Sequence, residues 1–389
     1  MEIERELRSL AESGNWGGQV VSVYADARWR DEAQRERLRL FWEQARERAR
    51  KEGITETLLA PIDQRIESML RNGPGVRALA MFSGPGRFVT VNLPVSAGLH
   101  ASWSDRPTLL PLADAASRTD RALVAVVGAK GSRIYDMVGQ SVLSRVVLEH
   151  GEFPGRHAQG GFSNSHLQHH IEAHLRWSLD DVAQALVQAF DREPCRVFVC
   201  GTPQVNGLFM ELLPVRVKAR ATTLEYLGGD PGREQQEVLE RIGARLETDR
   251  VADALTLEDR VYQESQGGGF GALGAQDVLL ALQEGRVHEL LMKEGFTCSG
   301  AECTRCGALD VKRFTGCVYC GGEVRAGSLV EAIVAKAINE GAKVRLVPDQ
   351  PRHARVGGIA ALLRPGRGVA WPTTGTVDRT EDFTVGKPV

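Results

Sequence analysis

The sequence lacks any apolar run of the roughly 18 to 20 residues that would cross a bilayer as a helix. Its first residues, MEIERELRSL, are charged, unlike the apolar centre of a signal peptide. The formal net charge is −2, so the chain as a whole is no polycation, and any contact with RNA must come from local patches. These absences predict a cytoplasmic protein without membrane contact.

Repeats and two common enzyme motifs are also missing. The chain shows no internal repeat, and no His-Glu-x-x-His pattern of a catalytic zinc site occurs. The glycine-rich stretch SQGGGFGALG lacks the Lys-Ser/Thr ending of a phosphate-binding loop and does not follow a predicted strand. We therefore interpret this stretch as a connection that bends between helices, rather than as a phosphate site.

Cysteines are few and unevenly distributed. Five of the seven fall between Cys298 and Cys320, and the other two are Cys195 and Cys200. This clustering is typical of metal binding in a reducing compartment and not of a secreted disulfide framework. Cys195 and Cys200 flank an apolar stretch, RVFV, and are predicted to be packed thiols.

Two Cys-x2-Cys pairs predict a zinc site. They are Cys303 with Cys306 and Cys317 with Cys320, separated by ten residues. Each pair would bring two thiolates to one side of a tight turn, and four thiolates form the tetrahedron that Zn²⁺ accepts. Four sulfur ligands leave no open position for water, so the predicted site is structural and stabilises its domain by binding metal. Cys298 either replaces one ligand or belongs to the core.

The length of 389 residues predicts more than one domain at about 150 residues each. Predicted strands and helices alternate along the chain, which indicates α/β domains. The predicted division is an N-terminal α/β domain over 1–118, a central domain over 119–228, a C-terminal α/β domain over 229–366 with the zinc ribbon at 298–325, and a disordered tail over 367–389.

Within the first two domains, patterning predicts individual elements. The N-terminal domain has a strand at VVSVYADA, helices over about 31–51 and 55–71, and strands at ALAMF and FVTVNLP. The central domain begins with an antiparallel meander of ALVAVVG, GSRIYDMVG and SVLSRVVLEHG. A helix over about 165–190, the strand RVFVCG, a short helix and the strand VRVKARATTL follow.

The C-terminal domain is predicted to start with a long charged helix over about 233–264. The stretch VHELLM, the cysteine cluster, the helix SLVEAIVAKAINEG and the strands AKVRLVP and GGIAALLRP follow it. This order completes a third α/β unit.

Histidines gather at the start of the predicted helix over 165–190. His166, His169, His170 and His174 are spaced at i, i+3, i+4 and i+8, which places them on one helical face. Three interpretations stay open: a metal site shared by two imidazoles, a solvated polar face, or a surface that stacks on RNA bases and bonds phosphate.

A glycine pair precedes this helix in the stretch RHAQGGFSNS. Its residues Arg156, His157, Gly160, Gly161 and Ser163 match a loop of the form basic-His-Gly-Arg-Gly-Gly-Gln-Ser. That loop occurs in the bacterial archaeo-eukaryotic release factor family, with family 10 as the candidate subgroup, and in the related archaeal and eukaryotic class-1 peptide-chain release factors. From about Leu123 to Pro365 the sequence resembles this family, to which Pelota is also related.

The C-terminal domain carries two further points of resemblance. Archaeal release factors have Cys-x2-Cys pairs inserted in an α/β domain, and they end in a Gly-Gly-Ile-Ala-Ala-Ile-Leu-Arg strand, matched here by GGIAALLR at 357–364. The resemblance implies an α/β, three-domain, release-factor-like fold with a zinc ribbon inserted in the C-terminal α/β domain.

Departures from the family pattern bear on function. Phe162 stands where the family has glutamine, Gln159 replaces an arginine, and His166 and His169 replace helix arginines. The N-terminal domain has no Asn-Ile-Lys-Ser stretch of the kind that reads stop codons. Codon-specific termination is therefore not expected.

The resemblance implies hydrolysis of the ester between a nascent peptide and tRNA, inside the ribosome. Two glycines allow close backbone approach, and the N–H of Phe162 would stabilise the oxyanion without needing a particular side chain. Gln159 or Asn164 could supply the amide that the missing glutamine provides. The implied catalytic group is Gln159, Gly160, Gly161 and Phe162, and the implied RNA-binding group is Arg156, His157, Ser163, Asn164, His166, His169 and His170.

Three functions remain open on the sequence. The first is a codon-independent peptidyl-tRNA hydrolase for ribosome rescue or peptide release. The second is a non-catalytic factor that occupies the ribosomal A site in hibernation or stress. The third is a zinc-ribbon module that binds RNA or protein away from ribosomes. The predicted partners are rRNA and peptidyl-tRNA on the ribosome, with a translational GTPase as a candidate delivery partner.

Overall fold

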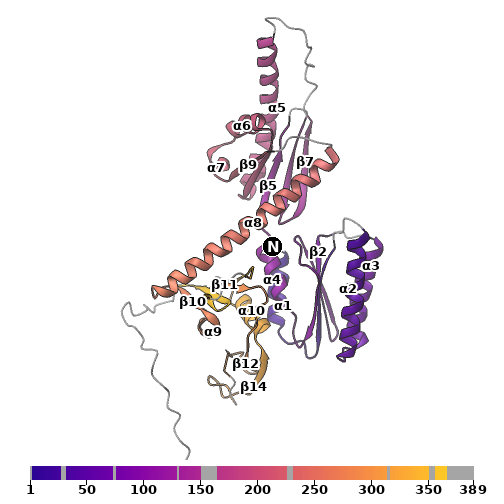
Figure 1. Ribbon diagram of the computed structural model, residues 1–389, viewed down its shortest axis with the longest axis vertical. Coiled ribbons are helices and arrows are strands. Elements are labelled where there is room, and N and C mark those ends of the chain that lie inside the picture. The colour runs from indigo at the N-terminus through magenta and orange to yellow at the C-terminus, as the bar shows by residue number, and fades with distance from the viewer. Residues whose placement is uncertain are drawn as a thin grey trace, which may run out of the picture. The chain divides into compact units, whose positions relative to one another are not determined.

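The computed structural model describes residues 2–27, 32–72, 76–128, 131–149, 164–225, 231–312, 316–349 and 355–365. The chain divides into two compact units, Met1–Asp253 and Ala254–Val389, and its described strands form four sheets (Figure 1). Helices pack on these sheets, so the predicted α/β class is confirmed. None of the helices in the described ranges is long and apolar enough to cross a membrane.

The first sheet of unit 1 is antiparallel, with strand order β3-β2-β1-β4. Its apolar face packs on two helices through residues such as Val23, Met81, Leu38, Leu59 and Ile62. The predicted strands and both helices are confirmed, whereas α1, β4 and α4 were not anticipated. The elements are α1 (Glu2–Ser13), β1 (Val20–Asp26), α2 (Glu32–Lys51), α3 (Glu56–Asn72), β2 (Ala78–Gly84), β3 (Arg87–Leu93), β4 (His100–Ser104) and α4 (Leu110–Ser117).

The second sheet of unit 1 has the strand order β7-β6-β5-β8-β9. Its first three strands form the predicted antiparallel meander, and β8 and β9 continue it in parallel. One face packs on α5 and α6, and the other packs on Val238 and Ile242 of α8. The elements are β5 (Arg121–Val126), β6 (Gly131–Val138), β7 (Ser141–Glu149), α5 (Asn164–Arg192), β8 (Arg196–Gly201), α6 (Pro203–Leu212), α7 (Val215–Lys218), β9 (Ala221–Glu225) and α8 (Pro231–Gln266). Helix α8 continues past Asp253 into unit 2.

One predicted strand of this region is confirmed only at its end. The stretch VRVKARATTL begins with the short helix α7, and only Ala221–Glu225 forms a strand. The carbonyl of Pro214 accepts hydrogen bonds from the N–H groups of Val217 and Lys218, which closes a helical turn. Alternating valines suggested a strand, but the proline and this local bonding start a turn instead.

The sheet of unit 2 has the strand order β10-β16-β11-β15. Strand β16, predicted from GGIAALLRP, is buried along its whole length and pairs with β10 and β11. A separate small sheet, β13-β12-β14, carries the cysteine pairs. The elements are β10 (Gly271–Leu273), α9 (Gly274–Gln283), β11 (Val287–Lys293), β12 (Ser299–Cys303), β13 (Leu309–Asp310), β14 (Val324–Ser328), α10 (Val330–Asn339), β15 (Lys343–Val347) and β16 (Ile359–Leu363).

Candidate metal centre and the histidine helix

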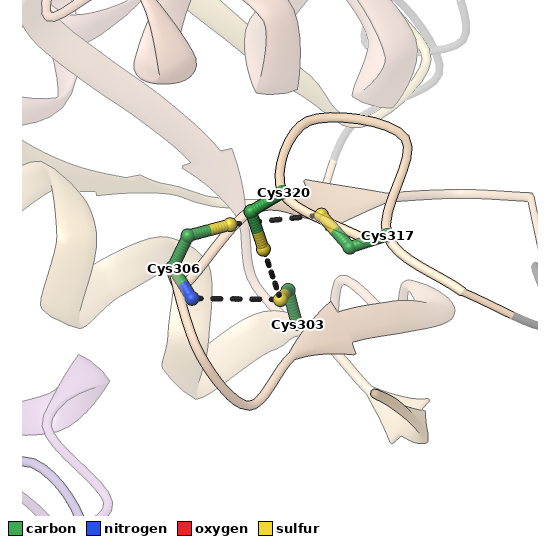
Figure 2. Close-up of side chains that lie close together, drawn as sticks. All are labelled: Cys303, Cys306, Cys317 and Cys320. Atoms are coloured by element: carbon green, nitrogen blue, oxygen red, sulfur yellow. Dashed lines mark hydrogen bonds between the residues drawn. The ribbon is translucent and has the colours of Figure 1, made fainter. Parts of the chain in front are cut away.

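Two turns beside the small sheet bring four cysteine sulfurs together (Figure 2). Cys303 and Cys306 lie at the end of β12, and Cys317 and Cys320 precede β14. The four Sγ atoms lie within 4.8 Å of one another. The Sγ atoms of Cys303 and Cys320 are 3.5 Å apart, and those of Cys306 and Cys317 are 3.6 Å apart.

The two turns repeat one backbone pattern. The N–H of Gly307 donates to the Cys303 carbonyl at 3.1 Å, and the N–H of Gly321 donates to the Cys317 carbonyl at 2.8 Å. Both glycines adopt positive φ, 67° and 68° respectively. Side-chain-bearing residues rarely adopt this conformation, so a glycine directly after each second cysteine explains why the chain can close both turns.

Gly322 keeps space free beside the sulfurs. A Cβ atom at this position would lie 3.2 Å from the Cys320 Sγ and 3.3 Å from the Cys303 Sγ. It would also lie 3.0 Å from the Cβ of Arg305, in the other turn. The sequence therefore lets the two turns approach each other closely.

Backbone donors make one of the sulfurs acidic. The N–H groups of Cys306 and Arg305 both donate to the Cys303 Sγ at 3.4 Å, and Figure 2 draws the first of these bonds. The bond from Cys306 is the largest cause that lowers the pKa of Cys303 to about 6. At Cys306 the N–H of Ala308 favours the thiolate, but hydrogen bonds with the neighbouring thiols, Cys320 first, outweigh it and raise the pKa to about 12. A cation would favour the thiolate form of all four groups.

The donor set fits Zn²⁺. Sulfurs bound at about 2.3 Å in a tetrahedron lie about 3.8 Å apart, close to the two sulfur separations of the cluster. All four predicted ligands are therefore brought together, and they could hold a metal ion. Cys298 is not in this group: it is buried, burial raises the pKa of its thiol, and its carbonyl accepts a bond from the N–H of Leu329.

The remaining two cysteines are packed thiols, as predicted. Cys195, directly before β8, and Cys200, within β8, are both buried in the clusters that pack on the second sheet of unit 1. Burial raises the pKa of Cys200 to about 12, so its thiol stays protonated and unreactive at neutral pH.

Most residues of the predicted glycine-pair site lie outside the described residues. These are Arg156, His157, Gln159, Gly160, Gly161, Phe162 and Ser163. Asn164, His166, His169 and His170 lie in the first turns of α5, which confirms the predicted helix. Their contact with RNA stays a prediction.

Helix α5 begins directly after this segment, and its later turns are held in the core. Leu179, Val182, Leu186 and Phe190 are buried against the second sheet of unit 1. The first half of the helix extends beyond the sheet (Figure 1). These buried side chains fix the later turns of α5 on the sheet.

Trp177 is a feature of α5 that the sequence patterns did not single out. Its side chain is 69% exposed, and its ring lies edge-on to that of His174, with centroids 5.5 Å apart and planes at 74°. The spacing of eleven residues from His166 could have revealed it, because eleven residues return a helix to almost the same face.

Residues 107–247 match the model of bacterial archaeo-eukaryotic release factor family 10. No curated protein matches the chain significantly. Among solved structures, the archaeal translation termination factor aRF1 is 18% identical, with 93% of this chain and 97% of that chain covered and a TM-score of 0.26. Archaeoglobus fulgidus Pelota is 17% identical, with coverages of 74% and 79% and a TM-score of 0.35. A chain from the ribosome-bound assembly of archaeal Pelota and ABCE1 is 14% identical, with coverages of 93% and 94% and a TM-score of 0.40.

Proposed function

We propose that this chain, of which residues 107–247 match the model of bacterial archaeo-eukaryotic release factor family 10, is a ribosome-associated translation factor that hydrolyses peptidyl-tRNA without reading a codon. The observation that carries the proposal is the family match over 107–247, which includes both the glycine pair and α5. Such a factor would act in ribosome rescue or peptide release.

The proposed chemistry depends on the backbone of the segment before α5. Gly160 and Gly161 allow the chain to approach the ester closely, and the N–H of Phe162 stabilises the oxyanion that forms on the carbonyl oxygen. Water attacks the carbonyl carbon, the bond to the ribose oxygen of the tRNA breaks, and that oxygen takes a proton as it leaves. Gln159 or Asn164 orients the water with a side-chain amide, in place of the glutamine that the family has at Phe162.

The proposed partners are rRNA and peptidyl-tRNA, with a translational GTPase as the delivery factor. Positively charged and hydrogen-bonding side chains around the glycine pair suit phosphate and base contacts. The proposed RNA-facing residues are Arg156, His157, Ser163, Asn164, His166, His169 and His170. They start before α5 and continue along the helical face on which His166 and His170 lie.

For unit 2 we propose a structural Zn²⁺ held by the four-cysteine cluster. Sulfur separations of 3.5 and 3.6 Å and the paired turns support this assignment. Binding would keep all four sulfurs in the thiolate form and hold β12 and β14 together at the turns.

A second function is favoured by one specific residue. Phe162 cannot make the hydrogen bond of the family's glutamine, which favours a factor that occupies the A site in hibernation or stress without cleaving the ester. A zinc-ribbon module acting on RNA or protein away from ribosomes is the third function.

Purified ribosomes stalled with a labelled peptidyl-tRNA separate the three functions. The intact protein should release the peptide, and Gly161→Ala should lower the release rate by about 100-fold, the cost of one misplaced oxyanion donor. Gly207→Ala is the matched control, because a Cβ on this exposed glycine of α6 would contact nothing within 4 Å. Co-sedimentation without release would support the A-site factor. No co-sedimentation at low salt, where phosphate contacts are strongest, would support the third function.

A further inference from the structure

Trp177 exposes a large aromatic surface that the fold does not use. The buried stripe of α5 runs through Leu179, Val182 and Leu186, and the Trp177 side chain lies away from it, 69% exposed. Among the side chains of α5 that the structure describes, it is the one exposed large hydrophobic group. An exposed indole adds nothing to the core, and its flat face is a surface on which another ring can stack.

The indole is held at a defined place on the helix. His174, one turn earlier, meets it edge-on at 5.5 Å between ring centroids. Arg176 is engaged elsewhere, in an ion pair with Glu211 of α6 at 3.6 Å. In a T-shaped pair His174 can cover at most one face of the indole, and with Trp177 69% exposed the other face is available to a flat partner.

The surroundings favour a nucleotide over an apolar protein surface. Within the described part of α5, Trp177 has no exposed large apolar neighbour with which it could form a hydrophobic patch. It lies about 20° around the helix from His166, on the face that also holds His170 and His174. Imidazole and indole rings stack on bases, and imidazole can donate to phosphate.

We propose that Trp177, positioned by His174, is a stacking platform for an unpaired nucleotide of ribosomal or transfer RNA. This deepens the proposed function and rests on it, since it extends the RNA-facing residues by two turns along α5. At 1.5 Å per residue the platform lies about 20 Å from Asn164, so it grips RNA at a distance from the ester. Asp180 and Asp181, which follow Trp177 on α5, are exposed. Their negative charges repel phosphates, so the RNA would approach Trp177 from the Asn164 end of the helix.

The test compares five full-length proteins in ribosome binding: wild type, Trp177→Ala, Trp177→Phe, Trp177→Leu and the control Val215→Ala. Because Trp177→Ala loses one stacked base, it should bind ribosomes at least about 5-fold more weakly than wild type. Trp177→Phe keeps an aromatic ring and should retain most of the affinity. Trp177→Leu should bind as poorly as Trp177→Ala, and retained binding in Trp177→Leu would overturn stacking in favour of an apolar protein contact. Val215→Ala, which shortens an 82% exposed side chain on α7, should bind like wild type.

A second arm measures binding of polyuridylate to the same proteins, which separates failure of the platform from failure of the proposed function. Equal ribosome binding by wild type and Trp177→Ala overturns the platform and leaves the proposed function standing. A wild type that binds polyuridylate through Trp177 but does not bind ribosomes supports the platform and contradicts the proposed function. Binding to neither overturns both. A photoreactive phenylalanine analogue at position 177, crosslinked on loaded ribosomes, then identifies rRNA or tRNA as the source of the nucleotide.

Discussion

Gly307 and Gly321 occupy the same place in two consecutive turns, each directly after the second cysteine of its pair, with φ of 67° and 68°. Each donates its N–H back to the carbonyl of the first cysteine. A cation that binds both turns at once would therefore be held by two copies of one local structure.

Replacing either glycine with alanine should weaken the ribbon. Gly321→Ala forces a side chain into the left-handed region, which costs about 1 kcal/mol or more, although its Cβ would meet nothing within 4 Å. The free energy of unfolding from urea titration, and the rate at which a chelator removes metal, would measure the effect. Gly327→Ala is the matched control, because Gly327 lies in β14 without positive φ and with open space at its Cβ. Equal stability of the two variants would contradict the strain argument.

The metal content itself is a second prediction. The protein purified without chelator should hold close to one Zn²⁺ per chain, measured by mass spectrometry of the digested sample, and Cys317→Ser should lose it with a lower Tm. Cys298→Ser should keep its zinc, because Cys298 lies outside the four-sulfur group. A folded, metal-free protein would refute the zinc assignment, and loss of zinc in Cys298→Ser would make Cys298 a ligand.

A buried ion-pair network joins α4 and α8 within unit 1. Arg118 Nε lies 3.0 Å from one carboxylate oxygen of Asp114, and an Nη atom of Arg250 lies 3.7 Å from the other. Arg250, whose side chain is only 10% exposed, also bonds Glu247 at 2.7 Å. Charges in this setting lose solvation, so removing one partner leaves the others uncompensated.

Arg250→Ala should therefore destabilise unit 1 by about 3 kcal/mol in urea unfolding. Arg245→Ala is the control: Arg245 pairs with Asp249 at 2.8 Å on the same helix, but its side chain is 50% exposed. That exposed pair should contribute no more than about 1 kcal/mol. Similar losses in both variants would mean that burial does not set the strength of the network.

The same network predicts a pH dependence. Burial alone raises the pKa of Glu247, but the hydrogen bond and charge of Arg250, together with the charge of Arg118, outweigh it and leave the pKa below its usual value of 4.5. A carboxyl with a lowered folded pKa stabilises the fold above its unfolded pKa, and this contribution is lost as pH falls through the folded value. The stability difference between wild type and Glu247→Gln should thus be larger at pH 7 than at pH 3.5 in urea unfolding. A difference independent of pH would contradict this linkage.

Elements and sites with a local sequence pattern could be predicted from the sequence. Features that depend on contacts with distant residues could not. Alternating apolar residues identified β5, β6 and β7, and cysteine spacing identified all four members of the sulfur cluster. Strand β4 was missed because HASWS carries little apolar pattern, and its place comes from pairing with β1. Trp177 was missed for a related reason: a single exposed residue has no periodicity, and its exposure is known only once the neighbours of α5 are in place. The network of Asp114 and Arg250 likewise joins residues far apart in the chain.

The last prediction separates the backbone of Phe162 from its ring. If the N–H of this residue stabilises the oxyanion, Phe162→Ala keeps the donor and should release peptide within about tenfold of wild type, whereas Phe162→Pro removes it and should lose about 100-fold or more. Single-turnover release from stalled ribosomes measures both variants, with co-sedimentation to confirm that each still binds. Proline also restricts the backbone angle φ. Ser163→Pro is therefore the control, because it introduces the same restriction one residue later and leaves the N–H of Phe162 in place. If Phe162→Ala and Phe162→Pro lower the rate of peptide release equally, the phenyl ring and not the backbone N–H is responsible. The backbone mechanism would then be wrong.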